Sequence, residues 1–199
     1  MSAITNLFIE IDRLWKPQES GKIKLRVIGS GAILLQTDYE RGTKDGDVLE
    51  SLELTSGIKE RLRTLAGKNT DLHKRTRLYL DIVVSGLPFL PHGPKFHPQS
   101  SLNSELKHFE IATLDVVDVV VSKLKRFNSD DVGDVTAMVN KGLVPHKQLV
   151  ERFNAAVDGC FSMGSRAEDL PKIIKNLHKV ERDSFRVPES RIELPDWMQ

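Results

Sequence analysis

The chain has 199 residues, which is enough for one domain with a buried core or for a compact domain that carries a helical extension. Its 29 lysine and arginine residues nearly balance its 28 aspartate and glutamate residues. This balance excludes an overall basic field for tight, sequence-independent binding of nucleic acid, so any such contact would need a local basic patch.

The single cysteine and the absence of long apolar runs define the expected compartment. One cysteine excludes an intrachain disulfide and a cysteine-rich zinc site, and it fits a reducing environment. The first twenty residues do not combine a basic start with an uninterrupted apolar stretch, and no later run is long enough to span a membrane. We therefore expect a cytoplasmic protein without a membrane partner.

In the first half of the chain, helical and strand patterns alternate. Helical spacing of apolar residues occurs over residues 3–15 and 56–68, and strand patterns occur at residues 24–28, 47–54, 76–87 and 106–114. The run 76–87 is apolar and β-branched apart from Asp81, so it predicts a buried strand that carries one carboxylate. Residues 88–104, rich in proline, glycine, histidine and serine, predict a loop.

From residue 115 onward the pattern becomes helical. Helices are predicted at residues 115–127, 130–141, 145–158 and roughly 166–184. The sequence thus predicts an α+β fold with two parts: an α/β core over residues 1–113 and a helical region over residues 114–199 packed on it.

The stretch RGTKDGDVL, residues 41–49, has two interpretations. Asp-Gly is a favoured pair at the tip of a two-residue hairpin turn. If a strand instead begins at Asp45, the side chains of Asp45 and Asp47 share one face, and a cation such as Mg²⁺ would offset their repulsion. A calcium-binding EF-hand loop is excluded, because with Gly46 as its turn glycine the first and twelfth positions would be Arg41 and Leu52.

The stretch KLRVIGSGAILL predicts a strand, a tight turn at Gly29 and Ser30, and a helix. The start of such a helix presents unpaired N–H groups, which favours phosphate binding. A dinucleotide-binding fingerprint is weakened by Leu34 at the third glycine position, and no Walker-type motif occurs.

Taken in order, IGSGAILL, RGTKDGDVL, a third aspartate on a later strand, and SKLKRFNSDDVGDV resemble the DNA polymerase β-like nucleotidyltransferase superfamily. The pattern looks most like the bacterial abortive-infection and type IV toxin nucleotidyltransferases and their uncharacterised relatives, over roughly residues 24–136. The resemblance implies a mixed sheet with flanking helices, followed by a C-terminal helical bundle. Gly46 departs from the pattern, in which a hydrophobic residue separates the paired acids.

The resemblance also implies roles for individual residues. Asp45, Asp47 and Asp81 would hold one or two Mg²⁺ ions and act in catalysis, and Lys123 would offset charge on the phosphates. The nucleoside triphosphate would contact Gly29, Ser30, Arg41, Thr43, Lys123 and Asp134, with Asp134 orienting either the lysine or the nucleotide. For Arg41 and Thr43 in the loop before the acids, simple solvation is the alternative, and for Asp134 it is the favourable position of an acid in the first turn of a helix.

Helical spacing gives an independent argument for Lys123. In a helix over residues 115–127, Lys123 lies on the apolar face with Val116, Val119 and Phe127, so its ammonium needs an anion. A triphosphate would serve. The alternatives are a lysine that reaches solvent from the edge of the stripe, or a strand in the β-branched run VVDVVV. Ser129 is the expected N-terminal cap of the next helix.

The sequence therefore favours a Mg²⁺-dependent nucleotidyltransferase that moves a nucleoside monophosphate to a hydroxyl of RNA, such as tRNA, or of a protein. By resemblance, a toxin role with a neutralising antitoxin partner is expected. One alternative is a nucleotide-binding or regulatory protein that retains the fold without turnover. Another is an α+β interaction protein in which Asp-Gly forms a hairpin. The preferred base and the oligomeric state stay open.

Overall fold

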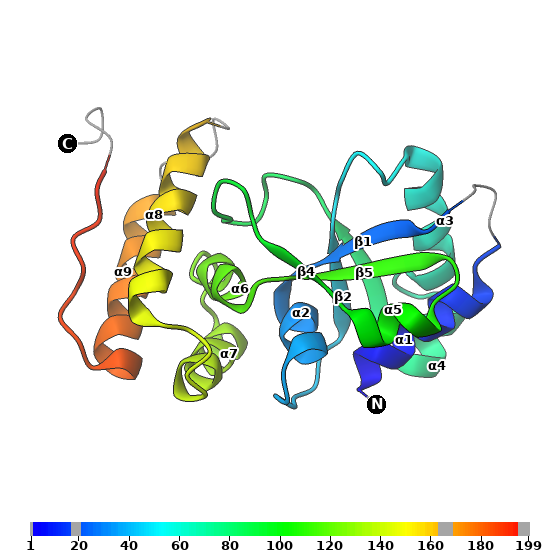
Figure 1. The fold of residues 1–199 in the computed structure, drawn as a ribbon, viewed down its shortest axis with the longest axis horizontal. Coiled ribbons are helices and arrows are strands. Elements are labelled where there is room, and N and C mark those ends of the chain that lie inside the picture. Colours follow the sequence, from blue (N-terminus) through cyan, green and yellow to red (C-terminus); the bar gives the residue numbers. More distant parts are fainter. Residues whose placement is uncertain (1, 17–20, 163–168, 195–199) are drawn as a thin grey trace. The chain divides into compact units, whose positions relative to one another are not determined.

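The computed structural model describes residues 2–16, 21–162 and 169–194. In these residues the protein is α+β, with a five-stranded mixed sheet and a set of C-terminal helices (Figure 1), which confirms the predicted fold class. The chain divides into two compact units, Met1–Ser85 with Phe96–Leu114 and Gly86–Lys95 with Asp115–Gln199. None of the described helices is long and apolar enough to cross a membrane.

The first unit contains the sheet. Its elements are α1 (Ala3–Leu14), β1 (Ile23–Val27), α2 (Gly29–Gln36), β2 (Asp45–Leu49), α3 (Ser56–Ala66), α4 (Asp71–Thr76), β3 (Tyr79–Val83), β4 (Phe96–Pro98), α5 (Ser100–Glu105) and β5 (Phe109–Leu114). The strand order is β3-β2-β1-β5-β4. Strand β1 pairs antiparallel with β2 and parallel with β5, β2 pairs parallel with β3, and β4 pairs antiparallel with β5.

Helix α1 is the long amphipathic helix that the sequence predicted. It buries an apolar stripe that includes Ile4, Phe8 and Ile11, and the Ser2 hydroxyl caps its first turn by accepting the N–H of Thr5. Near its end, the buried Asp12 carboxylate accepts the backbone N–H groups of residues 107, 108 and 109 at 2.7–3.1 Å. The helix is thereby attached to the start of β5.

Four features of the first unit differ from the sequence prediction. Strand β2 starts at Asp45 and ends at Leu49 rather than spanning residues 47–54, because the chain turns and leaves Leu52 fully exposed. The predicted loop 88–104 contains β4 and α5, and α4 was not predicted. Strand β3 is an edge strand, so Asp81 is exposed rather than buried.

The second unit is helical. It contains α6 (Val116–Lys123), α7 (Ser129–Asn140), α8 (His146–Ser162) and α9 (Leu170–Val180), followed by a π-helical turn, Glu181–Phe185. The run VVDVVV is therefore helical. Asn128 caps α7 in place of the predicted Ser129, because its side chain accepts the N–H of Asp131 in a capping box. The expected start of the last helix near residue 166 lies outside the described residues.

Buried carboxylates hold the second unit together. Asp118 on α6 forms a two-pronged ion pair with Arg152 on α8, at 2.6 and 2.7 Å, and also accepts the N–H of Lys95 at 2.9 Å. The backbone N–H of His92 donates to the carbonyl of Ala155. These contacts explain why residues 86–95 group with the helices rather than with the sheet.

Glu181 is a second buried carboxylate. Its oxygens lie 2.8 Å from Nε2 of His146 and 3.0 Å from the backbone nitrogen of Ser190. Burial acts to raise the pKa of Glu181, but the hydrogen bonds from Ser190 and His146 outweigh it and leave that pKa below its ordinary value of 4.5. The ionised carboxylate therefore stabilises the fold.

This arrangement predicts an acid-sensitive contribution to stability. Because the pKa of Glu181 is lower in the folded state, its contribution is complete above pH 4.5 and is lost as the pH falls through the lowered folded value. Urea unfolding at a series of pH values should show a smaller loss of unfolding free energy below pH 4.5 for Glu181→Gln than for the unchanged protein. Glu151→Gln, on an exposed part of α8, is the control and should follow the unchanged protein. Parallel curves for all three proteins would contradict the role of Glu181.

Candidate functional site

The turn between β1 and α2 brings the start of a helix against the strand β2. Gly29 opens α2 with a φ of +62°, and the backbone N–H of Ile28 donates to the carbonyl of Asp47 at 2.9 Å. A Cβ on Gly29 would lie 2.7 Å from Oδ2 of Asp47. Glycine is thus required both for the left-handed backbone and for the space that the carboxylate occupies.

Asp45, Gly46 and Asp47 lie in an extended strand. Gly46 is not among the glycines with positive φ, and β2 begins at Asp45, so the hairpin-tip interpretation is wrong. A Cβ on Gly46 would point at helix α1, 2.9 Å from Cδ1 of Ile4 and 3.5 Å from Cδ2 of Leu7. Because side chains alternate along a strand, Asp45 and Asp47 share the face directed away from α1.

Strand β3 adds the third aspartate to that face. In the parallel register of β2 and β3, Asp45 is opposite Tyr79 and Asp47 is opposite Asp81. Residues opposite each other on neighbouring parallel strands direct their side chains to the same side of the sheet. We refer to Asp45, Asp47, Asp81 and Tyr79 as the acidic face.

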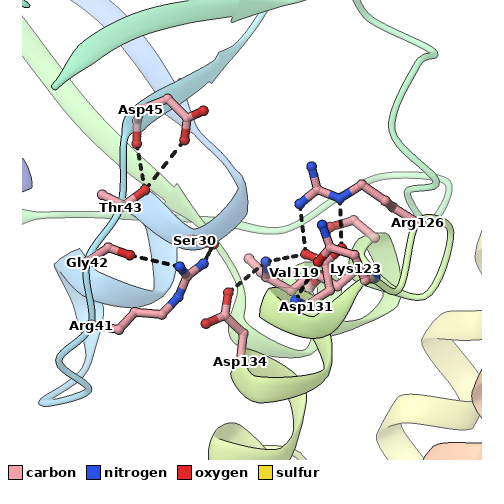
Figure 2. A network of polar contacts seen from close by, with 12 residues as sticks. Ser30, Arg41, Gly42, Thr43, Asp45, Val119, Lys123, Arg126, Asp131 and Asp134 are labelled. Carbon is pink, nitrogen blue, oxygen red and sulfur yellow. Dashed lines mark hydrogen bonds and ion pairs between the residues drawn. The ribbon is translucent and has the colours of Figure 1, made fainter.

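Three of the predicted phosphate-contact residues, Ser30, Arg41 and Thr43, lie near Asp45 in the first unit (Figure 2). The guanidinium of Arg41 donates from Nη2 to the hydroxyl of Ser30 and from Nη1 to the carbonyl of Gly42. The Thr43 hydroxyl donates to the carbonyl of Asp45 at 3.1 Å and lies 3.4 Å from its carboxylate. Arg41 and Thr43 are therefore ordered by the start of α2 and by Asp45, rather than belonging to a loop that only water contacts.

Tyr79 belongs to this face and was not predicted from the sequence. Its hydroxyl donates to Oδ2 of Asp45 at 3.3 Å. The pKa of Tyr79 is raised, first by burial, then by the charge and hydrogen bond of Asp45, and further by the charges of Asp81 and Asp47. The available signal was the spacing of two residues between Tyr79 and Asp81, which places both on one face of a strand.

The acidic face fits a hard cation that takes only part of its shell from the protein. Among the described residues, no group of three or more histidine, cysteine, aspartate or glutamate side chains is gathered closely enough to hold a metal ion, so Asp45, Asp47 and Asp81 do not form a three-carboxylate site. Mg²⁺ does not need one, since it commonly binds one or two carboxylates together with water and phosphate oxygens. Asp47 and Asp81, as register partners, are the pair best placed to start such a site.

Lys123, in the second unit, is buried and fully engaged (Figure 2). Its Nζ lies 2.7 Å from Oδ2 of Asp134 and 3.0 Å from Oδ1 of Asp131, and Arg126 binds the other oxygen of Asp131 at 2.8 Å. Burial acts to raise the pKa of Asp131, but Arg126 and Lys123 outweigh it and leave that pKa lowered. The anions that the buried lysine requires are supplied by α7, so the interpretation of a lysine that reaches solvent is wrong.

The sheet, the Gly29–Ser30 turn and the acidic face together define a nucleotidyltransferase-type α+β protein. A family model described as a nucleotidyltransferase of unknown function (DUF6036) matches residues 2–175, and the chain belongs to this family. Comparisons with curated proteins and with solved structures found no match. The nucleotidyltransferase resemblance is thus confirmed at the level of the family.

The geometry predicts that Gly29 tolerates no side chain. Gly29→Ala should lower the unfolding free energy by about 1–2 kcal/mol from the left-handed backbone alone, with a further cost from displacement of the Asp47 carboxylate. Urea unfolding measures the change. Gly42→Ala is the matched control, because no atom lies within 4 Å of its Cβ position and its φ is not positive. Equal effects of the two substitutions would contradict the close approach.

The contact between Gly46 and α1 predicts coupling between two positions. Gly46→Ala should destabilise the protein by about 1 kcal/mol, because its Cβ overlaps Cδ1 of Ile4. Ile4→Val removes that atom, so the double variant should be more stable than the sum of the single effects by at least about 0.5 kcal/mol. Additive unfolding free energies in a double-mutant cycle would show that Gly46 does not face Ile4.

Proposed function

We propose that the protein is a Mg²⁺-dependent nucleotidyltransferase that moves a nucleoside monophosphate from a nucleoside triphosphate to a hydroxyl of an acceptor. One observation carries this proposal: Asp45, Asp47 and Asp81 share one face of β2 and β3, directly beside the start of α2. Family membership supports the reaction class.

The start of α2 and the acidic face have different tasks in this proposal. Ser30 and the N–H groups at the start of α2 bind the terminal phosphates, and Arg41 adds positive charge beside them. Mg²⁺, held by Asp47 and Asp81 together with water and phosphate oxygens, would supply Lewis acidity at the phosphate oxygens, with the charge of Asp45 beside it. Asp81, exposed on the edge strand, positions the acceptor hydroxyl and accepts its proton. The acceptor oxygen forms a bond to the α-phosphorus, the bond to the β-phosphate oxygen breaks, and pyrophosphate leaves.

The roles of Lys123 and Asp134 in this proposal follow from the ion pair between them. Their ion pair at 2.7 Å supports the role in which Asp134 orients the lysine. The ammonium of Lys123 offsets phosphate charge in this proposal only if a phosphate oxygen replaces one of its two aspartate partners, since both partners are within 3.0 Å.

The finer parts of the proposal follow the resemblance of the motifs. They are a toxin-type role in the cytoplasm, an acceptor hydroxyl on RNA such as tRNA or on a protein, and a neutralising antitoxin. The near-equal numbers of acidic and basic residues favour neither acceptor.

The proposal predicts nucleotide binding that depends on both Mg²⁺ and Asp47. Calorimetric titration with each nucleoside triphosphate should show binding in Mg²⁺, and Asp47→Asn should reduce transfer of labelled α-phosphate to total RNA or protein by about 100-fold or more. Asp71→Asn is the matched control, because Asp71 lies on the exposed side of α4 and forms an exposed ion pair with Lys74. It should behave like the unchanged protein.

Two outcomes would contradict parts of this proposal. If no triphosphate binds in Mg²⁺, both the proposed enzyme activity and the alternative of a nucleotide-binding protein are contradicted. Binding without transfer, unchanged by Asp47→Asn, would remove catalysis at the acidic face and leave a nucleotide-binding or regulatory protein of the same fold.

A further inference from the structure

A cavity of about 460 Å³ opens in the first unit beside the residues that precede β2. Its wall is formed by the start of α1, by Leu34 of α2, by residues 39–43, and by residues 76–78, from the last residue of α4 to the residue before β3. Cavities that bind small molecules commonly measure about 300–1,000 Å³. No aspartate of the acidic face contributes to the wall, so the cavity is a separate place in the molecule.

The lining of the cavity combines an apolar part with positive charge. Ile4, Leu34 and Leu78 supply apolar surface, and Tyr39 supplies an aromatic ring. Arg41 and Arg77 supply two guanidinium groups, against one acidic residue of the described lining, the exposed Glu40. The start of the twelve-residue helix α1 adds the partial positive charge of its first N–H groups. Such a lining favours a ligand with a ring and an anionic group.

Arg77 is the residue of the lining that is best suited to bind an anion. It follows α4 with a φ of +62°, it is exposed, and the described part of the chain offers its guanidinium no hydrogen-bond or ion-pair partner. It ends a segment, residues 56–77, that contains seven lysines and arginines against two acidic residues, whereas the rest of the chain is acidic on balance. This local excess of positive charge attracts anions in a chain with almost no net charge.

Two residues of the cavity wall make hydrogen bonds to Ser30 and to Asp45 of the acidic face. Arg41 lines the cavity and donates to the hydroxyl of Ser30, and Thr43 lines the cavity and donates to the carbonyl of Asp45 (Figure 2). A ligand that draws Arg41 or Thr43 toward the cavity therefore changes the hydrogen bonds of Ser30 or Asp45. The two places are coupled through residues 41–43.

We propose that the cavity is a second ligand site that binds a nucleoside monophosphate group, either free or as the end nucleotide of an oligonucleotide. The phosphate binds Arg77 and Arg41, and the ring packs against Tyr39 and Leu34. Occupancy is communicated to the acidic face through Arg41 and Thr43; this last step rests on the proposed function.

The test measures binding to the cavity without loading the acidic face. Nucleoside monophosphates are titrated into the protein by calorimetry in the absence of Mg²⁺. Arg77→Gln should weaken their binding by about tenfold or more, since one charge-assisted contact with phosphate is lost. Arg75→Gln is the matched control, because Arg75 is exposed, pairs with Glu10 and does not line the cavity; its affinity should be unchanged. Leu34→Trp, which narrows the cavity from its apolar side, should also weaken binding.

Separate arms distinguish the two sources of the ligand. Binding of the monophosphates with this dependence on Arg77 identifies a free mononucleotide, and binding of a 5′-phosphorylated trinucleotide alone, with the same dependence, identifies an oligonucleotide end. The proposal is overturned if neither ligand binds, or if Arg77→Gln leaves the affinity unchanged.

The same titrations separate this site from the proposed function. Asp47→Asn should leave monophosphate binding intact while it removes triphosphate binding in Mg²⁺. Triphosphate binding that is retained in Arg77→Gln also shows that this variant is folded. If the proposal for the cavity is wrong, monophosphate binding is absent or independent of Arg77. If the proposed function is wrong, triphosphate binding in Mg²⁺ is absent or independent of Asp47.

Discussion

The close approach of the Asp47 carboxylate to Gly29 is the constraint on which the candidate site depends. It requires a residue without a Cβ, in a left-handed conformation, at the point where β1 ends and α2 begins. In the same turn the backbone N–H of Ile28, directly before α2, donates to the carbonyl of Asp47 on the strand that carries the carboxylates. A helix N-terminus and a carboxylate are thus placed side by side, which is the arrangement on which the proposed binding of a metal-bound phosphate rests.

Helix α1 determines which face of the sheet carries the chemistry. Its Ile4 side chain occupies the space that a side chain at position 46 would fill, so the hydrophobic contact usual between the paired acids is supplied from the helix instead of the strand. At its other end, Asp12 binds the first backbone N–H groups of β5. With one face of the sheet packed against α1, the alternation of β2 leaves Asp45 and Asp47 on the other face.

The carboxylates of the two units have different surroundings. In the second unit, Asp118 is paired with Arg152, and Asp131 and Asp134 are paired with Lys123. These ion pairs connect neighbouring helices and so help to fix how the helices pack. In the first unit, three aspartates share a face, and their combined charge helps to raise the pKa of Tyr79. Repulsion among these carboxylates is the physical reason for proposing a cation on this face.

Much of the fold was accessible from the sequence because it rests on local patterns. The apolar stripes of α1, α3 and α9 and the β-branched run of β3 identified their elements, and the order of the motifs identified the nucleotidyltransferase class. Short elements were missed, since β4 and α5 lie in a segment rich in proline and glycine and depend on pairing or packing with β5. The burial of Asp81 was misjudged, because the position of a strand within the sheet is not encoded in its own residues.

By itself, the sequence determined that Asp45 and Asp47 would share a face if a strand began at Asp45, and that Lys123 would lie on the apolar face if residues 115–127 formed a helix. Only the tertiary structure decided between a strand and a turn at Gly46, because that choice depends on Ile4, forty-two residues earlier in the chain. It also decided which anions Lys123 meets and that Tyr79 joins the acidic face. These outcomes depend on strand register and helix packing, which bring together residues whose separation in the sequence carries no local signal.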